Sequence, residues 1–253
     1  MNIDRFLIIL FLSMGVLSVK AETKNPSDMS IFNFIKGTTD NYLGLSLYSD
    51  KEMEIVESYI SDNFGKFDDV FHEFASSVIH VDICIIPPTQ EHNYLTLVTM
   101  GMGAKKMNVP FGLRDQPRTR AELLICLPPD WPLSEDSLKE GKWYWPIRLL
   151  SKLARLPFDE NSWIGEGHTI EYGECFDEST QLCGAILVTP QIQNFKPCFL
   201  TKRKVVNFFQ VIPLYKDEID FKQRHNDEEL LKLFSKDDMI IDPNRNSALD
   251  KEQ

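Results

Sequence analysis

Apolar runs separated by turn residues are clearest in the middle of the chain, between residues 78 and 133. Three runs there are rich in Val, Ile, Leu and Thr and are bounded by Pro, Gly or Asn; they cover residues 78–86, 94–101 and 121–127. This composition and length are typical of β-strands. Because the first two runs are almost continuously apolar, we expect strands that are covered on both faces. The stretch therefore predicts the centre of a β-sheet.

Helical periodicity is found on both sides of these strands. Residues 49–65 repeat apolar residues at helical spacing after Ser49, a favourable N-cap. Residues 142–158 do the same, and Pro146 fits the first turn of that helix. Further strands are expected over residues 168–172, 182–189 and 205–215, and a last short helix over residues 228–234. The pattern predicts an α/β (α+β) fold, in which helices flank a mixed β-sheet.

The first 21 residues differ in composition from the rest of the chain. Arg5 precedes an apolar stretch, residues 6–19, which is followed by the small residue Ala21. This order is typical of a cleavable secretory signal, and the stretch is too short for a comfortable membrane span. We therefore expect residues 1–21 to be a signal peptide of an exported (periplasmic or secreted) protein without stable membrane insertion. The alternative is a cytoplasmic protein that starts near Met29.

The rest of the chain predicts one domain and a tail. We expect the domain to cover residues 30–235, because no internal repeat or low-complexity linker divides this region. Residues 236–253 are polar, and we expect them to fray.

Composition and charge narrow the classes of function. The 253-residue chain has 43% hydrophobic and 26% charged residues, which is typical of a globular protein with a sizeable core. Its net charge of −11 argues against nucleic-acid binding, which normally requires a basic face. The same charge is compatible with a basic protein partner, although solubility alone also explains it. The five cysteines form no CxxC motif, so we expect buried free thiols and no zinc site.

The sequence contains few candidate catalytic or ligand-binding residues. His80 and Asp82 lie two residues apart on a predicted strand, so their side chains share one face. We interpret them as a structural polar pair in the core, because a metal site would need a third ligand that the sequence does not place beside them. No familiar nucleotide-binding or hydrolase motif is found. The sequence thus predicts no cofactor, no metal and no catalytic residue. The competing hypothesis is a His/Asp-dependent hydrolase that uses His80, Asp82 and His168.

Seven short runs carry a family resemblance through their order and spacing. They read HVDICIIPP, YLTLVTMGMGAKKMNVP, RAELLICLPPDWP, WPIRLLSKLARLPF, WIGEGHTI, CGAILVTP and FFQVIPLYKDEIDF. The most distinctive pieces are the Thr-Met-Gly-Met turn that precedes Val109, the Arg-Ala-Glu-Leu strand entry at Arg120, and the Gly-His-Thr run at Gly167. With these runs, the chain resembles the suppressor-of-fused domain over about residues 42–234.

The resemblance implies a non-catalytic protein-binding module. Animal relatives hold a transcription factor and grip a short peptide partly by strand addition, whereas bacterial relatives resemble immunity proteins that neutralise secreted toxins. The short chain favours the bacterial single-domain form. We therefore predict an immunity- or antitoxin-like protein that binds a basic toxin; the alternative is a peptide-binding adaptor or regulator without a toxin partner. The candidate protein-binding residues are Gly101, Met102, Gly103, Val109, Pro110, Gly167 and His168.

Overall fold

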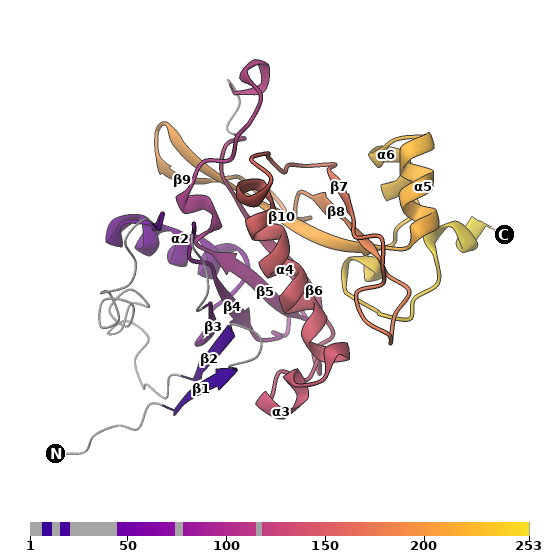
Figure 1. The fold of residues 1–253 in the computed structure, drawn as a ribbon, viewed down its shortest axis with the longest axis horizontal. Helices are drawn as coiled ribbons and strands as arrows, with labels where there is room; N and C mark the ends of the chain where they lie inside the picture. The colour runs from indigo at the N-terminus through magenta and orange to yellow at the C-terminus, as the bar shows by residue number, and fades with distance from the viewer. Residues whose placement is uncertain (1–6, 12–15, 21–44, 74–77, 115–117, 253) are drawn as a thin grey trace.

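The protein is built around one mixed β-sheet, seen in a computed structural model that describes residues 7–11, 16–20, 45–73, 78–114 and 118–252 (Figure 1). The strands are β1 (Leu7–Phe11), β2 (Val16–Lys20), β3 (Asp69–Glu73), β4 (Asp82–Ile86), β5 (Leu95–Met100), β6 (Ala121–Leu127), β7 (Thr169–Glu171), β8 (Gly184–Val188), β9 (Cys198–Thr201) and β10 (Lys204–Leu214). The helices are α2 (Asp50–Asn63), α3 (Glu135–Leu138), α4 (Gly141–Asp159), α5 (Lys216–Arg224) and α6 (Asp227–Lys232). Short 3-10 turns are η3 (Met102–Ala104), η4 (Phe111–Leu113), η5 (Asp237–Met239) and η6 (Ala248–Glu252).

The strand order is β1-β2-β3-β4-β5-β6-β10-β8-β7, and β9 pairs with β10 off this path. Strands β6 and β10 are parallel, with Ala121 opposite Asn207, while the other described neighbours are antiparallel. Strand β10 is the longest described strand, with 11 residues, and its two halves pair with different neighbours. It therefore connects the central sheet to the β9 hairpin.

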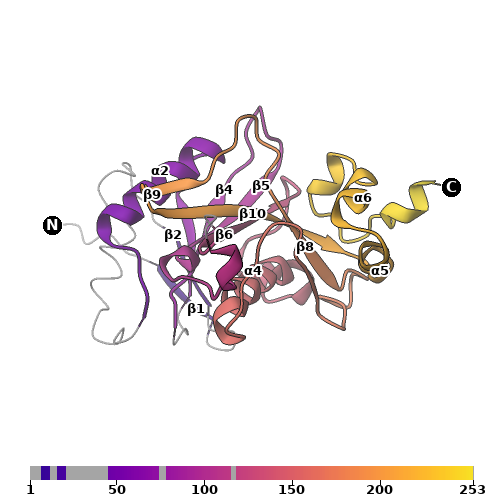
Figure 2. The ribbon, with the colours of Figure 1, turned by 90° about the horizontal axis from the view of Figure 1, so that it is seen from above.

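Both faces of the central strands are covered, which explains their continuous apolar sequence. Leu123 and Ile125 pack into a cluster that includes α4, whereas Leu124 packs on the other face into a cluster that includes α2. Figure 2 shows α2 and α4 on opposite sides of the sheet. A third cluster joins β8 and the end of β10 to α5 and α6. Burying one large aliphatic side chain contributes roughly 1.5–3 kcal/mol, so these clusters hold the layers together.

The predicted fold class is confirmed: a mixed sheet is flanked by helices. The central strands and helices α2 and α4 lie within a few residues of their predicted positions. The sequence analysis missed β9 and α5. The cysteines are free, as expected, and four of them are buried while Cys175 is exposed.

The segment after α6 is packed, although the sequence predicted that it would fray. Ile241 is buried and its N–H donates to the carbonyl of Cys126 at 2.9 Å, and Ala248 is fully buried. Arg245 holds the segment in place through a bidentate ion pair with the buried Glu218. These contacts make the segment from Ile241 to Ala248 part of the folded body.

The predicted signal segment falls partly outside the described residues, which leave out residues 1–6, 12–15 and 21–44. Within the segment, β1 pairs with β2, and β2 pairs with β3. Of the helices that the structure describes, none combines the length and apolar character needed to cross a bilayer.

Candidate functional site

A fully buried carboxylate, Glu122, lies at the start of β6 beside the turn that follows β5. Its Oε1 accepts hydrogen bonds from the Tyr48 hydroxyl at 2.8 Å and from the N–H groups of Gly101 and Gly103, both at 2.9 Å. Its Oε2 accepts one from the Thr99 hydroxyl at 2.7 Å. Burial raises the pKa of Glu122 to about 7, although these four donors pull the pKa down. The side chain thus ties three separate parts of the chain together.

The glycines of this turn are required by its tight geometry. Gly101 has φ +128°, and a Cβ there would lie 2.0 Å from the carbonyl oxygen of His80. A Cβ on Gly103 would lie 2.2 Å from the Tyr48 hydroxyl. Met102 between them is fully buried. The predicted binding residues Gly101, Met102 and Gly103 are therefore enclosed, and the N–H groups of the two glycines hold Glu122.

The other two predicted residues of this region begin a projecting loop. Val109 is buried, and its carbonyl accepts a hydrogen bond from Arg114 Nε at 2.6 Å. Pro110 is exposed, and the neighbouring residue Phe111 is 86% exposed. Figure 1 shows this loop, with η4 at its end, standing away from the body of the protein. Pro110 and Phe111 are therefore accessible to a partner, whereas Val109 is not.

Gly167 and His168 lie in the loop that leads into β7. Gly167 has φ +74°; its N–H donates to the Leu187 carbonyl at 2.8 Å, and its carbonyl accepts from Lys222 Nζ at 2.7 Å. The His168 ring packs edge-on against Trp163 at a centroid distance of 4.3 Å. Burial lowers the pKa of His168, and nearby positive charges lower it further, so the ring is neutral at neutral pH.

This loop borders a groove of about 590 Å³, which we call the β10 groove. Its apolar lining consists of Trp163, Ile164, Val188, Phe195, Pro197, Phe208, Phe209 and Leu231. Its charged lining consists of Arg118, Glu166, Asp227 and Glu228. Two of the acidic lining residues, Glu166 and Glu228, are exposed, so the groove combines apolar residues with an acidic rim.

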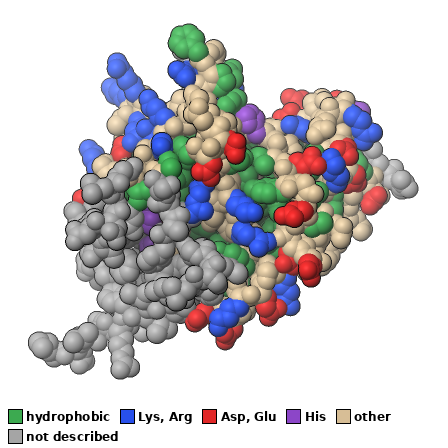
Figure 3. Space-filling view, viewed as in Figure 1, with side chains coloured by type: hydrophobic (Ala, Val, Ile, Leu, Met, Phe, Trp, Pro, Cys, Tyr) green, Lys and Arg blue, Asp and Glu red, His purple; other side chains and the backbone are tan. Residues whose placement is uncertain are grey.

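The surface is not uniformly acidic despite the net charge of −11. Figure 3 shows Lys and Arg side chains gathered near the β9–β10 turn, where Lys202 and Arg203 are exposed. It also shows hydrophobic side chains on the projecting loop, and Phe199 on β9 is 58% exposed. The surface thus carries basic and apolar patches as well as acidic side chains.

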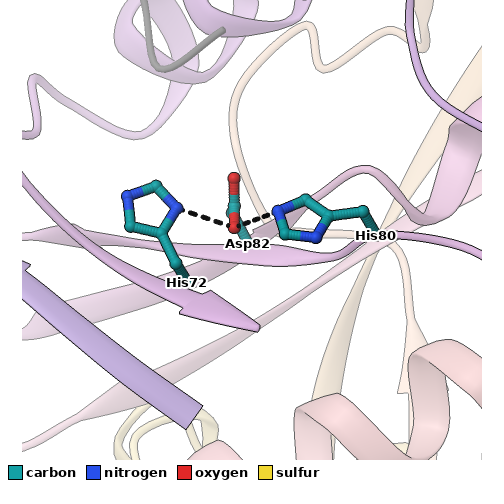
Figure 4. Close-up of side chains that lie close together, drawn as sticks. All are labelled: His72, His80 and Asp82. Atoms are coloured by element: carbon teal, nitrogen blue, oxygen red, sulfur yellow. Dashed lines mark hydrogen bonds and ion pairs between the residues drawn. The ribbon is translucent and has the colours of Figure 1, made fainter. Parts of the chain in front are cut away.

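The structure brings His80 and Asp82 together and adds a residue that the sequence analysis did not consider for this site. His80 Nε2 and His72 Nδ1 each lie 2.9 Å from Asp82 Oδ1 (Figure 4). All three side chains are buried. Burial raises the pKa of Asp82, but the two histidines outweigh this effect and lower the pKa to about 2. His168, which the hydrolase hypothesis requires at this pair, lies against Trp163 instead.

Comparisons with known proteins identify the family to which the chain belongs. The sequence profile described as Suppressor of fused protein (SUFU) matches residues 77–246, about two thirds of the chain. The chain belongs to the suppressor of fused family. Domains of this family commonly mediate protein–protein binding and serve as binding or regulatory modules.

Two solved SUFU structures and one further relative resemble this SUFU chain. A SUFU homolog from Neisseria gonorrhoeae FA 1090 is 17% identical with a TM-score of 0.53, over 79% of this chain and 96% of that one. Drosophila Suppressor of Fused is 14% identical with a TM-score of 0.53, over 78% of this chain and 51% of that one. "Uncharacterized protein UU111" of Ureaplasma parvum serovar 3 is 24% identical over 79% of this chain and 96% of its own length. The structural matches show the fold, and the chain corresponds to about half of the Drosophila protein.

Proposed function

We propose that this SUFU domain is a non-catalytic module that binds a protein partner in the β10 groove. The observation that carries the proposal is the groove itself, whose lining combines apolar residues with the exposed carboxylates of Glu166 and Glu228. Its volume of about 590 Å³ is sufficient for a few side chains of a bound segment. Binding surfaces commonly combine apolar residues with polar residues at the rim.

The proposed partner is a basic secreted toxin, which the domain neutralises as an immunity- or antitoxin-like protein. Glu166, Asp227 and Glu228 outnumber Arg118 around the groove, so a Lys- or Arg-rich segment suits the rim. The net charge of −11 would attract the same partner at longer range. A peptide-binding adaptor without a toxin partner would use the same groove and differs only in what the partner does.

Affinity capture followed by a toxicity assay tests this proposal. The tagged full chain is used to capture proteins from its native host, and mass spectrometry identifies the protein that co-purifies in equal amount. We expect the purified partner to inhibit growth when it is expressed alone and to lose this effect when the chain is co-expressed. A stoichiometric partner without toxicity would favour the adaptor. A small molecule that the chain converts to a product would contradict the non-catalytic assignment.

We further propose export, because Arg5, the apolar residues 6–19 and Ala21 follow the order of a secretory signal. Cleavage after Ala21 would yield a mature protein that begins at Glu22 and lacks β1 and β2. Strand β3 would then be an edge strand of the described sheet, open on the side that β2 occupies. N-terminal sequencing of native protein should begin near Glu22. A sequence that begins at Met1 or Met29 would contradict export by this signal.

A further inference from the structure

Three side chains of types that can bind a metal lie together on one face of the sheet. None of them lines the β10 groove. His72 is the residue after Phe71, which pairs with Ile83, so His72 reaches the level of Asp82 on the neighbouring strand. His80 precedes Asp82 by two residues and shares its face. Figure 4 shows the two imidazole rings pointing toward the Asp82 carboxylate from opposite sides. Residues ten positions apart in sequence are thus brought together by the pairing of β3 and β4.

The spacing of their ligand atoms suits a cation. His72 Nδ1, His80 Nε2 and Asp82 Oδ1 all lie within 4.8 Å of one another, and each nitrogen is 2.9 Å from Oδ1. A metal ion about 2.1 Å from each ligand separates adjacent ligands by roughly 3.0 Å in octahedral geometry and roughly 3.4 Å in tetrahedral geometry. The distances from Oδ1 to the two nitrogens therefore match those between adjacent ligands of one ion.

The second carboxylate oxygen of Asp82 is an independent indication. Asp82 is 1% exposed, and its Oδ2 has no hydrogen-bond partner among the described residues. A buried carboxylate oxygen without a donor is costly, and a cation held by both oxygens of Asp82 would compensate it. The two histidines explain the position of Oδ1 but not that of Oδ2.

We propose that His72, His80 and Asp82 bind one divalent transition-metal cation. Two imidazoles and one carboxylate favour Zn²⁺, Fe²⁺, Co²⁺ or Ni²⁺ over Mg²⁺ and Ca²⁺, which prefer all-oxygen sites. The ion would link β3 to β4, and it would stabilise the fold because it binds the folded chain in preference to the unfolded one. This site is separate from the partner-binding groove, so it can be tested without a partner.

A metal titration tests the site. The full chain is first treated with a chelator and then titrated with Co²⁺, while visible absorption reports binding. Zn²⁺ is added afterwards as a competitor. We expect one Co²⁺ per chain, without the sulfur-to-cobalt charge-transfer band that cysteine ligands produce. His72→Gln and Asp82→Asn should each weaken binding at least about tenfold. His225→Gln is the matched control, because His225 is exposed and pairs with Glu229 on α6.

A second readout does not depend on the variants folding. In the wild-type chain, Zn²⁺ should shift the NMR signals of the His72 and His80 ring nitrogens and leave those of His225 unchanged. Absence of stoichiometric Co²⁺ and Zn²⁺ binding by the wild-type chain would overturn the proposal. Equal binding by folded His72→Gln, or a zinc-induced shift confined to other histidines, would overturn it as well.

Discussion

Glu122→Ala is expected to lower the free energy of unfolding by at least about 3 kcal/mol, because it removes the common acceptor of four donors inside the core. The Tyr48 and Thr99 hydroxyls and the N–H groups of Gly101 and Gly103 would be left buried without Glu122. The truncation also leaves a cavity. Urea unfolding at about pH 6 measures the change. A loss below about 1 kcal/mol would show that water or side-chain movement replaces the carboxylate.

Glu122→Gln is the matched variant. Its amide oxygen can accept from the donors that now meet Oε1, and its NH₂ group can donate to Thr99 Oγ1, which already accepts from Leu123 N–H at 2.8 Å. We therefore expect a smaller loss, about 1–2 kcal/mol. An equal loss in the two variants would show that size and shape, not the hydrogen bonds, determine the effect.

The same pair of proteins, wild type and Glu122→Gln, reports the charge state of Glu122. Because burial raises its folded-state pKa from 4.5 to about 7, its contribution to stability is present below about pH 4.5 and is lost as the pH rises through about 7. The stability of the wild type relative to Glu122→Gln should therefore fall by on the order of 3 kcal/mol over this range. A difference that does not change with pH would contradict the raised pKa.

Arg245→Ala is expected to cost about 3–5 kcal/mol, because it leaves the fully buried Glu218 carboxylate without its cation. Arg245 Nη1 and Nη2 contact the two Glu218 oxygens at 2.5 and 2.6 Å, and Nη2 also donates to the Pro213 carbonyl at 3.0 Å. Arg245→Lys should recover only part of the loss, because an ammonium group cannot form the bidentate contact.

Urea unfolding combined with limited proteolysis checks this prediction. Arg245→Ala should also make the segment after α6 sensitive to protease, because Glu218 anchors that segment through Arg245 and through the Ala248 N–H. Arg224→Ala, at an exposed arginine on α5, is the control and should change stability by less than about 0.5 kcal/mol. If the protease cleaved the tail of the wild-type protein readily, the sequence-based prediction of a frayed tail would be right and the packed tail would be contradicted.

The central strands and α4 could be predicted because their burial is visible in the pattern of apolar residues along the sequence. Ala121–Leu127 is buried at every position, and α4 repeats apolar residues on one face. Helix α5 has no such apolar pattern, because it buries only Glu218 and Ile219 and its first turn is acidic. Strand β9 has four residues and alternates buried and exposed positions, which is too short a pattern to identify. The tail was misread because its polar sequence is held by residues distant in the chain, such as Glu218, which pairs with Arg245, and Cys126, which accepts from the Ile241 N–H.

Predicting the sites from the sequence was harder than predicting the fold, because the sites are formed by contacts between residues that are distant in the chain. The shared face of His80 and Asp82 follows from strand periodicity, but His72 joins them only through the register of β3 and β4. The Thr-Met-Gly-Met turn was recognised, yet its partner Glu122 lies within an apolar strand where a lone acid gives no sign of its role. The β10 groove draws on the loop before β7, on β10 and on α6, so no single stretch of sequence reveals it.

Charge reversal at the rim tests the central claim, that the β10 groove binds a basic protein. Surface-binding kinetics would compare the wild type with Glu228→Lys, and with Glu54→Lys, which makes the same charge change at an exposed position of α2. We expect Glu228→Lys to weaken binding to the captured partner at least about tenfold and Glu54→Lys to have a much smaller effect. Raising the salt concentration from about 50 to about 500 mM should slow wild-type association roughly tenfold, with a smaller change in dissociation. Equal binding by wild type and Glu228→Lys, with a salt-independent association rate, would contradict the account.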